Sequence, residues 1–205
     1  MEKNSFDAII FDLGGVIINL DYQLTIDAFK NLGLANFDEM YTQAKQSNLF
    51  DDFETGKISS QHFINSLLPF LPSGVSANKV VHAWNAMILD FPKERLELLD
   101  KLKSNYRIFL LSNTNDIHLQ AVKRSLANTT DRKLESYFEK VYFSHEVMLR
   151  KPHKEIFELV CNEQNLDPSR TLFIDDTIGH IDGSIKIGLK GLHLKGDNSI
   201  EKLFK

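Results

Sequence analysis

Three aspartates, a serine and a lysine have the side-chain types and the spacing that one reaction would need. Asp12 stands in FDLGGV, Ser112 in LLSNTN, Lys151 in RKP, and Asp175 and Asp176 in FIDD. The aspartates and the serine follow short apolar runs, and the lysine lies between them after a loop. Each residue alone has an ordinary explanation, such as capping a turn or a helix. Their common position behind apolar runs favours a single site.

The chemistry that suits this set is phosphoryl transfer, which needs a nucleophile, a divalent cation and charges that hold the phosphate oxygens. A carboxylate such as Asp12 can act as the nucleophile and split hydrolysis into two easier steps. Mg²⁺ prefers oxygen ligands, which Asp12, Asp176 and the backbone carbonyl of Gly14 can supply. Asp175 either ligates the ion directly or holds Lys151 and a metal-bound water. The sequence therefore predicts a Mg²⁺ site.

The phosphate group itself needs hydrogen-bond donors and positive charge. We expect Ser112, Asn113 and nearby backbone N–H groups to bind its oxygens. Lys151 would neutralise charge between the nucleophile and the phosphate. Asp12 and Lys151 are thus the predicted catalytic residues, and the substrate is predicted to be a small phosphorylated metabolite.

The elements that must position these residues alternate between strands and helices. Apolar runs of strand length occur at residues 6–11, 108–111, 141–143, 171–174 and 191–194. Such runs are typical of strands buried on both faces of a parallel sheet. Helical spacing follows Pro92 and Pro152 and recurs over residues 178–187, which end before Gly188. The pattern predicts a Rossmann-like α/β fold, in which ligands bind beyond the carboxyl ends of the strands.

One segment interrupts this alternation. Residues 21–91 contain no good strand pattern and show helical spacing at 24–32, 38–50, 60–68 and 78–89. We expect a small helical bundle inserted after the first strand, with Asp21 capping its first helix. The predicted core is then residues 1–20 and 92–205, and two hinge segments near Leu20 and Phe91 join it to the insert.

Composition excludes several other classes of protein. The formal charge of −4 and the pI of about 6.0 do not suggest a nucleic-acid-binding protein. The first apolar run is short and ends at Asp12, so it predicts neither a signal peptide nor a membrane span. A single cysteine, Cys161, excludes an intramolecular disulfide and fits a reducing compartment. We therefore expect a cytoplasmic protein, and the sequence leaves its oligomeric state open.

In this order, FDLGGV, LLSNTN, RKP and FIDD resemble the four motifs of the haloacid dehalogenase-like hydrolases, over nearly the whole chain. The resemblance implies a C1 cap for the helical insert, Mg²⁺ as cofactor and an aspartyl-phosphate on Asp12. LSNTNDIH (residues 111–118) and ETGKIS (residues 54–59) are most similar to a bacterial branch with FDLGNV-type first motifs. That branch includes an α-D-glucose-1-phosphate phosphatase, which implies hydrolysis of a small phosphomonoester such as a sugar phosphate.

One position departs from the phosphatase pattern of this family. Most of its phosphatases carry a second aspartate two residues after the nucleophile, which protonates the leaving oxygen and later activates water. Gly14 occupies this position and has no side chain to do either. Three explanations are open: water or another residue, with His118 as the candidate, donates the proton; the leaving group needs little help; or the enzyme is slow.

Two other functions compete with phosphate hydrolysis. A 2-haloacid dehalogenase would use the aspartate nucleophile without a metal. The pair Asp175 and Asp176 argues against it, because such a site must attract a carboxylate substrate. The second alternative is a catalytically weak protein that binds a metabolite or a partner, and Gly14 is its support.

Overall fold

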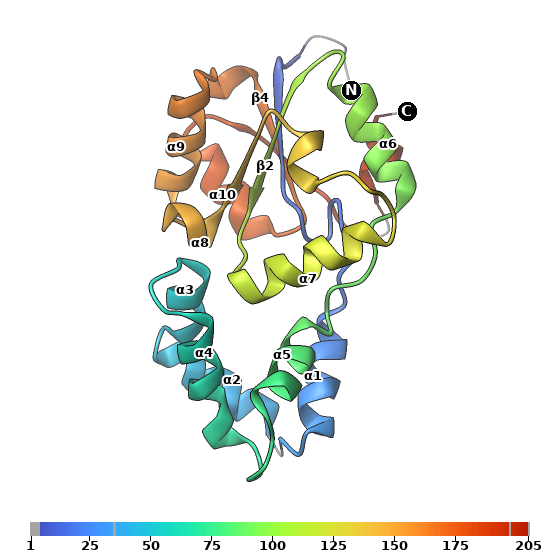
Figure 1. Cartoon of the computed structure of the whole chain (residues 1–205). Coiled ribbons are helices and arrows are strands. Elements are labelled where there is room, and N and C mark those ends of the chain that lie inside the picture. Colours follow the sequence, from blue (N-terminus) through green and yellow to red (C-terminus); the bar gives the residue numbers. More distant parts are fainter. Residues whose placement is uncertain (1–4, 35, 197, 205) are drawn as a thin grey trace.

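The computed structural model describes residues 5–34, 36–196 and 198–204. Its centre is a five-stranded parallel sheet with the strand order β3-β2-β1-β4-β5 (Figure 1). The strands are β1 (Ala8–Phe11), β2 (Arg107–Ser112), β3 (Lys140–Phe143), β4 (Thr171–Asp175) and β5 (Lys190–His193). All five lie on the runs expected from the sequence, and the α/β prediction is confirmed.

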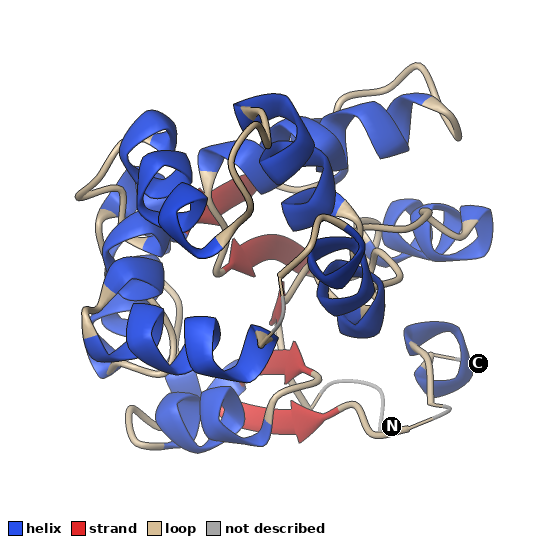
Figure 2. Cartoon of the chain, turned by 90° about the horizontal axis from the view of Figure 1, so that it is seen from below, coloured by secondary structure: helices blue, strands red, loops and turns tan. Residues whose placement is uncertain are grey.

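Successive residues of each strand pack into opposite layers, as the pleat of a strand requires. Ile9 and Phe11 join one hydrophobic cluster, while Ile10 joins another. The first cluster includes residues of α6 (Lys93–Leu102), α7 (Asp116–Ala127) and α11 (Ile200–Leu203). The second includes residues of α9 (Lys154–Gln164) and α10 (Ile178–Ile185). Helices therefore flank the strands on both sides (Figure 2).

The strand order determines where a ligand can bind. β1 lies in the middle, and the chain builds outward first to β2 and β3 and then to β4 and β5 on the other side. Such a reversal opens a crevice at the carboxyl ends of the strands. The residues after β1, β2 and β4 consequently meet at one edge of the sheet.

The helical insert (residues 21–91) forms a separate layer below this edge in Figure 1. Its helices are α1 (Tyr22–Asn31), α2 (Phe37–Gln46), α3 (Leu49–Glu54), α4 (Ser60–Leu67) and α5 (Ala77–Asn85), with a 3₁₀ turn at Leu68–Phe70. The insert has a hydrophobic cluster that includes the buried side chains of Phe29, Phe53 and Phe63, and Ile117 of α7 in the core joins it. As expected, the Asp21 side chain caps α1 by accepting a hydrogen bond from the backbone N–H of Gln23 at 2.9 Å.

The prediction of one helix over residues 38–50 is wrong. The segment forms two helices, α2 and α3, and the chain breaks at Asn48, whose φ is +58°. Asparagine enters this left-handed region more readily than most residues, and it cannot continue a helix there. The break starts α3, which ends at Glu54 next to the core.

Two backbone segments join the insert to the core. Asn19 donates to the Asp90 carbonyl at 2.9 Å, and Asp21 donates to the Met87 carbonyl at 2.9 Å. A bridge between Leu20 and Ile88 completes a short antiparallel pair. The two hinge segments are therefore paired with each other through their backbones. Among the described residues, no helix has both the length and the apolar character needed to traverse a bilayer.

Candidate active site

A buried lysine between two carboxylates forms the centre of the site. Lys151 Nζ lies 2.8 Å from Asp12 Oδ1 and 2.6 Å from Asp175 Oδ2. The side chains of Lys151 and Asp175 have no exposed surface, and that of Asp12 is 10% exposed. Three residues far apart in the sequence are therefore brought into one charged group by the neighbouring ends of β1 and β4 and the loop before α9.

The Asn113 side chain holds the backbone of Lys151. Its amide nitrogen donates to the Lys151 carbonyl at 2.9 Å, and its amide oxygen accepts from the Lys151 N–H at 2.9 Å. Both ends of this side chain are thus engaged. We expected Asn113 to bind phosphate, but its side chain positions the lysine, which leaves its backbone for that role.

Asp175 is held on both of its oxygens. Oδ2 accepts from Lys151, while Oδ1 accepts from the backbone N–H of Thr177 at 2.8 Å. His180 Nδ1 lies 3.0 Å from each oxygen. Of the two roles open to Asp175, these contacts favour holding Lys151 over direct metal ligation. His180 had no recognisable signal in the sequence, because it lies one helical turn beyond the motif.

The charges of this cluster shift one another's pKa values. Burial raises the pKa of Asp12 to about 7, although Lys151 opposes the shift, and the carboxylates of Asp175 and Asp176 push it further upward. Burial and Asp175 also raise the pKa of Asp176. Burial works upward on Asp175 as well, but Lys151 and His180 hold its pKa below the usual value. The site therefore carries more negative charge than one lysine can balance.

The donor set fits a divalent cation. Asp12, Asp175 and Asp176 against Lys151 leave a formal charge of −3 + 1 = −2 when all are ionised. The Asp176 carboxylate lies against the loop after β1, where a Cβ on Gly15 would be 2.2 Å from Asp176 Oδ2. The Asp176 carboxylate therefore lies against the same loop that carries Asp12 and Gly14. Among the described residues, ligand atoms of Asp12, Asp175 and His180 lie within 4.8 Å of one another.

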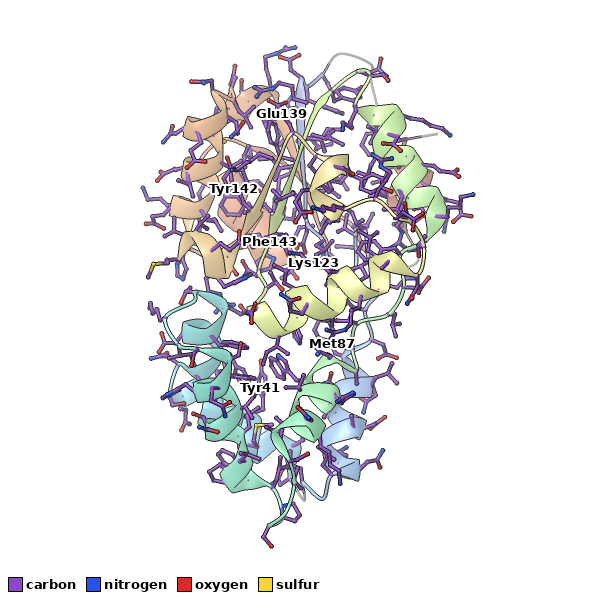
Figure 3. All side chains as sticks on the ribbon, in the orientation of Figure 1. Tyr41, Met87, Lys123, Glu139, Tyr142 and Phe143 are labelled. Atoms are coloured by element: carbon purple, nitrogen blue, oxygen red, sulfur yellow. The ribbon has the colours of Figure 1, made fainter. Side chains whose placement is uncertain are left out.

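A cavity of about 740 Å³ lies between the sheet edge and the helical insert. The core lines it with Gly14, Ser112, Asn113, His118 and Arg150. The insert lines it with Tyr22, Tyr41, Lys45, Phe50, Asp51, Glu54, Trp84 and Met87, of which Tyr41 and Met87 are labelled in Figure 3. The Ser112 hydroxyl contacts the Asn113 carbonyl at 3.5 Å, the outer limit for a hydrogen bond, and so stays available to a ligand.

Trp84 and His118 connect the two sides of the cavity. Trp84 packs against the hydrophobic cluster of the insert and also lines the cavity. Its ring stacks on that of His118 at 4.9 Å, and its carbonyl oxygen lies 3.0 Å from His118 Nε2. Burial lowers the pKa of His118 to about 4. A neutral imidazole with its Nε2 engaged is a poor proton donor, which counts against the role suggested for His118.

Two residues of the cavity, Tyr22 and Arg150, were not assigned a role from the sequence. Tyr22, the first residue of α1, lines the cavity and is 61% exposed as a whole residue. Desolvation of its hydroxyl group and the nearby carboxylates raise its pKa to about 12. Arg150, next to Lys151, pairs with Asp51 and Glu54 of α3. Lys57 lies outside this cavity and pairs with Asp52 instead. No sequence motif signals the contacts of Arg150 with Asp51 and Glu54, because they depend on how the insert packs against the core.

Comparison with known proteins identifies the family. Residues 6–188 match the model of the haloacid dehalogenase-like hydrolases. A D-ribitol-5-phosphate phosphatase of Bacteroides thetaiotaomicron is 29% identical over 182 residues, which cover 89% of this chain and 88% of that one. The chain therefore belongs to the haloacid dehalogenase-like hydrolase family.

Solved structures agree with this assignment. A crystal structure of a HAD family enzyme from B. thetaiotaomicron has a TM-score of 0.91 and 34% identity, and the match covers 98% of this chain and 99% of that one. The wild-type form of that enzyme was also solved in complex with magnesium and inorganic phosphate, with a TM-score of 0.89, 35% identity and coverage of 98% and 100%. A predicted HAD-like family hydrolase of Porphyromonas gingivalis has a TM-score of 0.82, 32% identity and coverage of 95% and 92%.

Proposed function

We propose that this protein is a Mg²⁺-dependent phosphatase that hydrolyses a small phosphomonoester through an aspartyl-phosphate on Asp12. The observation that carries the proposal is the buried Asp12–Lys151–Asp175 group, whose sequence neighbours Leu13, Gly14 and Arg150 line the cavity. Two similar proteins support the proposal: the D-ribitol-5-phosphate phosphatase with 29% identity, and the HAD family enzyme whose structure was solved with magnesium and inorganic phosphate.

Asp12 and Lys151 would have different roles in the reaction. An Asp12 carboxylate oxygen attacks phosphorus, a new O–P bond forms, and the bond to the leaving alcohol oxygen breaks. Lys151, held by Asn113 and Asp175, stabilises the negative charge that gathers on the phosphoryl oxygens. Water then attacks phosphorus, the bond to Asp12 breaks, and phosphate leaves. Ser112 would donate to a phosphate oxygen during both steps.

Asp12, Asp176 and the Gly14 carbonyl would hold the ion, with Asp175 as a further ligand or as the support of Lys151. Mg²⁺ bound there would offset the excess negative charge and polarise the phosphoryl group.

The helical insert would act as a cap over the reaction. A covered site excludes bulk water and large substrates. Sugar phosphates and sugar-alcohol phosphates are the proposed class, because one relative is a D-ribitol-5-phosphate phosphatase. The resemblance to the glucose-1-phosphate branch supports the same class with a different leaving group. We also propose a cytoplasmic location, where the buried thiol of Cys161, whose pKa burial raises to about 11, would remain inert.

A panel assay tests this proposal. The purified protein with Mg²⁺ would be given ribitol 5-phosphate, glucose 1-phosphate, glucose 6-phosphate and p-nitrophenyl phosphate, and phosphate release would be measured. We expect turnover of at least one sugar or sugar-alcohol phosphate. Absence of phosphate release from every compound, with a folded protein, would contradict the proposal and favour a binding protein.

A further inference from the structure

The leaving oxygen needs a proton, and the residue that usually supplies one is replaced by Gly14. Sugar and sugar-alcohol oxygens are poor leaving groups unless they are protonated, so the gap matters for the proposed substrates. The donor must reach the cavity from another element. Six described cavity residues carry an ionisable proton: Tyr22, Tyr41, Lys45, Asp51, Glu54 and His118.

Glu54 is held at a fixed place on the cavity wall. It is the last residue of α3, and its side chain is 27% exposed. Two residues later, Gly56 has a φ of +68°, and a Cβ there would be 2.2 Å from the His145 carbonyl oxygen of the core. The turn after Glu54 therefore sits directly on the core. The buried Thr55 hydroxyl ties it to the Asp51 carbonyl at 2.7 Å.

The surroundings of Glu54 favour a carboxyl group that both holds and releases a proton. Burial raises its pKa, Arg150 opposes this at 2.9 Å, and the Asp51 carboxylate of the same helix adds to the rise. The carboxyl end of α3 also disfavours a negative charge. The positive charge of Lys151 also opposes the rise in the pKa of Glu54. Glu54 Oε2 is buried and makes no hydrogen bond of good geometry within the described structure, although it pairs with Arg150.

We propose that Glu54 is the acid and base of the reaction and replaces, from the helical insert, the side chain missing at Gly14. The inference rests on the phosphatase function proposed above. As Asp12 attacks phosphorus and the bond to the leaving oxygen breaks, the Glu54 carboxyl proton moves to that oxygen. The Glu54 carboxylate then takes a proton from the water that attacks the aspartyl-phosphate. Phosphate leaves, and both side chains return to their starting states.

The other candidates fit the role less well. The Asp51 side chain is 56% exposed and pairs with Arg150, and Tyr41 and Lys45 are also exposed. His118 is neutral, and its Nε2–H donates to the Trp84 carbonyl. The Tyr22 phenol, with its pKa raised to about 12, stays protonated at neutral pH. A phenol of that kind can donate a hydrogen bond, but it does not provide the base that the second step needs.

The test compares leaving groups in Glu54→Gln and the wild type. Glutamine keeps the shape of the side chain and cannot donate or accept the proton. General acid catalysis contributes about 10²–10⁴-fold, so kcat/KM for ribitol 5-phosphate and glucose 6-phosphate should fall by at least about 100-fold. For p-nitrophenyl phosphate, whose leaving oxygen needs no proton, the loss should stay below about fivefold. Asp51→Asn is the matched control, because Asp51 shares Arg150 but its side chain is 56% exposed.

Two further measurements separate proton transfer from a structural effect. In the wild type, kcat/KM for the poor leaving groups should decline as pH rises through the pKa of Glu54, and this decline should be absent in Glu54→Gln. In Glu54→Gln, activity toward the poor leaving groups should return when Gly14 is replaced by aspartate. A Cβ at Gly14 would be 2.6 Å from Leu20 Cδ1, a flexible atom, so Gly14→Asp is combined with Leu20→Ala.

The inference is overturned if Glu54→Gln lowers kcat/KM equally for all leaving groups, if Asp51→Asn behaves in the same way, or if the pH profile is unchanged. A lowered Tm would show that Glu54→Gln has lost its fold. In that case Glu54→Asp, which keeps the carboxyl group, is measured instead. The inference then requires that Glu54→Asp show the same dependence of kcat/KM on the leaving group as the wild type. A wild-type protein that releases no phosphate from any compound contradicts the phosphatase function itself, which is a different outcome from a uniform loss in the variant.

Discussion

The two walls of the cavity are built in different ways. On the core side of the cavity, Asp12, Lys151 and Asp175 are buried and lie at or near the ends of paired parallel strands. On the insert wall, Tyr22 is 61% exposed, and Glu54 projects from a short helix. Strand pairing and burial therefore hold the charged side chains of the core in place. The side chains of the insert, by contrast, reach the cavity only when the insert packs against the core.

Two adjacent residues show the same contrast on the smallest scale. Lys151 has no exposed side-chain surface and lies between core carboxylates. Arg150 is 23% exposed and holds Asp51 and Glu54 of the insert. One loop therefore connects the reaction centre to the docking of the insert. The following predictions test whether the core wall controls the chemistry and the insert wall its efficiency.

Asp12→Asn should have the largest effect. An amide cannot form the acyl-phosphate, so kcat should fall by about 10⁴-fold or more, as for the loss of other nucleophiles. Because asparagine is nearly the same size, the protein should remain folded by circular dichroism. Activity near the wild-type level in a folded Asp12→Asn protein would exclude Asp12 as the nucleophile.

Removal of the metal should have the second largest effect on activity. Excess chelator, or Asp176→Ala, should abolish measurable phosphatase activity, and added Mg²⁺ should restore it only to the chelated wild type. The reason is that three carboxylates near one lysine need a cation to be ionised together. Full activity in chelator would reopen the metal-independent dehalogenase alternative.

Mg²⁺ binding should weaken as pH falls. The raised pKa of Asp12, about 7 without the ion, means that Asp12 is protonated below that pH and must lose the proton before it can ligate. The Kd from calorimetry should rise by up to about tenfold per pH unit below 7 and level off above it. A Kd that stays constant between pH 5 and pH 8 would show that Asp12 is ionised throughout.

A smaller effect is expected from undocking the insert. In Gly56→Ala, the added methyl group meets the His145 carbonyl, so the turn must shift at a cost of about 1–3 kcal/mol. We expect a lower kcat and a higher KM with the core chemistry intact. Gly74→Ala is the control: its φ is +90°, but nothing lies within 4 Å of its Cβ. Equal kinetics in the two variants would show that contact with His145 does not matter.

His118→Ala should have the smallest catalytic effect. Loss of the contact with the Trp84 carbonyl should lower stability by about 1 kcal/mol. The change in kcat/KM should be similar for p-nitrophenyl phosphate and for glucose 6-phosphate. A large loss for the poor leaving group alone would restore His118 as the proton donor and would contradict the assignment to Glu54.

The sequence by itself determined much of the core wall. Short apolar runs marked all five strands, and the residues that follow them included Asp12, Ser112 and Asp175. This works because parallel pairing brings the carboxyl ends of strands to one edge whatever the loops do. The location of a residue that follows a strand can therefore be predicted from the local sequence pattern.

Only the tertiary structure decided the insert wall and the support of the core charges. The break at Asn48, the clamp of Asn113 on Lys151 and the contact of Trp84 with His118 had no local signal. Arg150 meets Asp51 across 99 positions of the chain. Such contacts depend on how two separately packed layers dock, and the energy of docking is spread over many side chains. No single residue pattern in the sequence therefore encodes them.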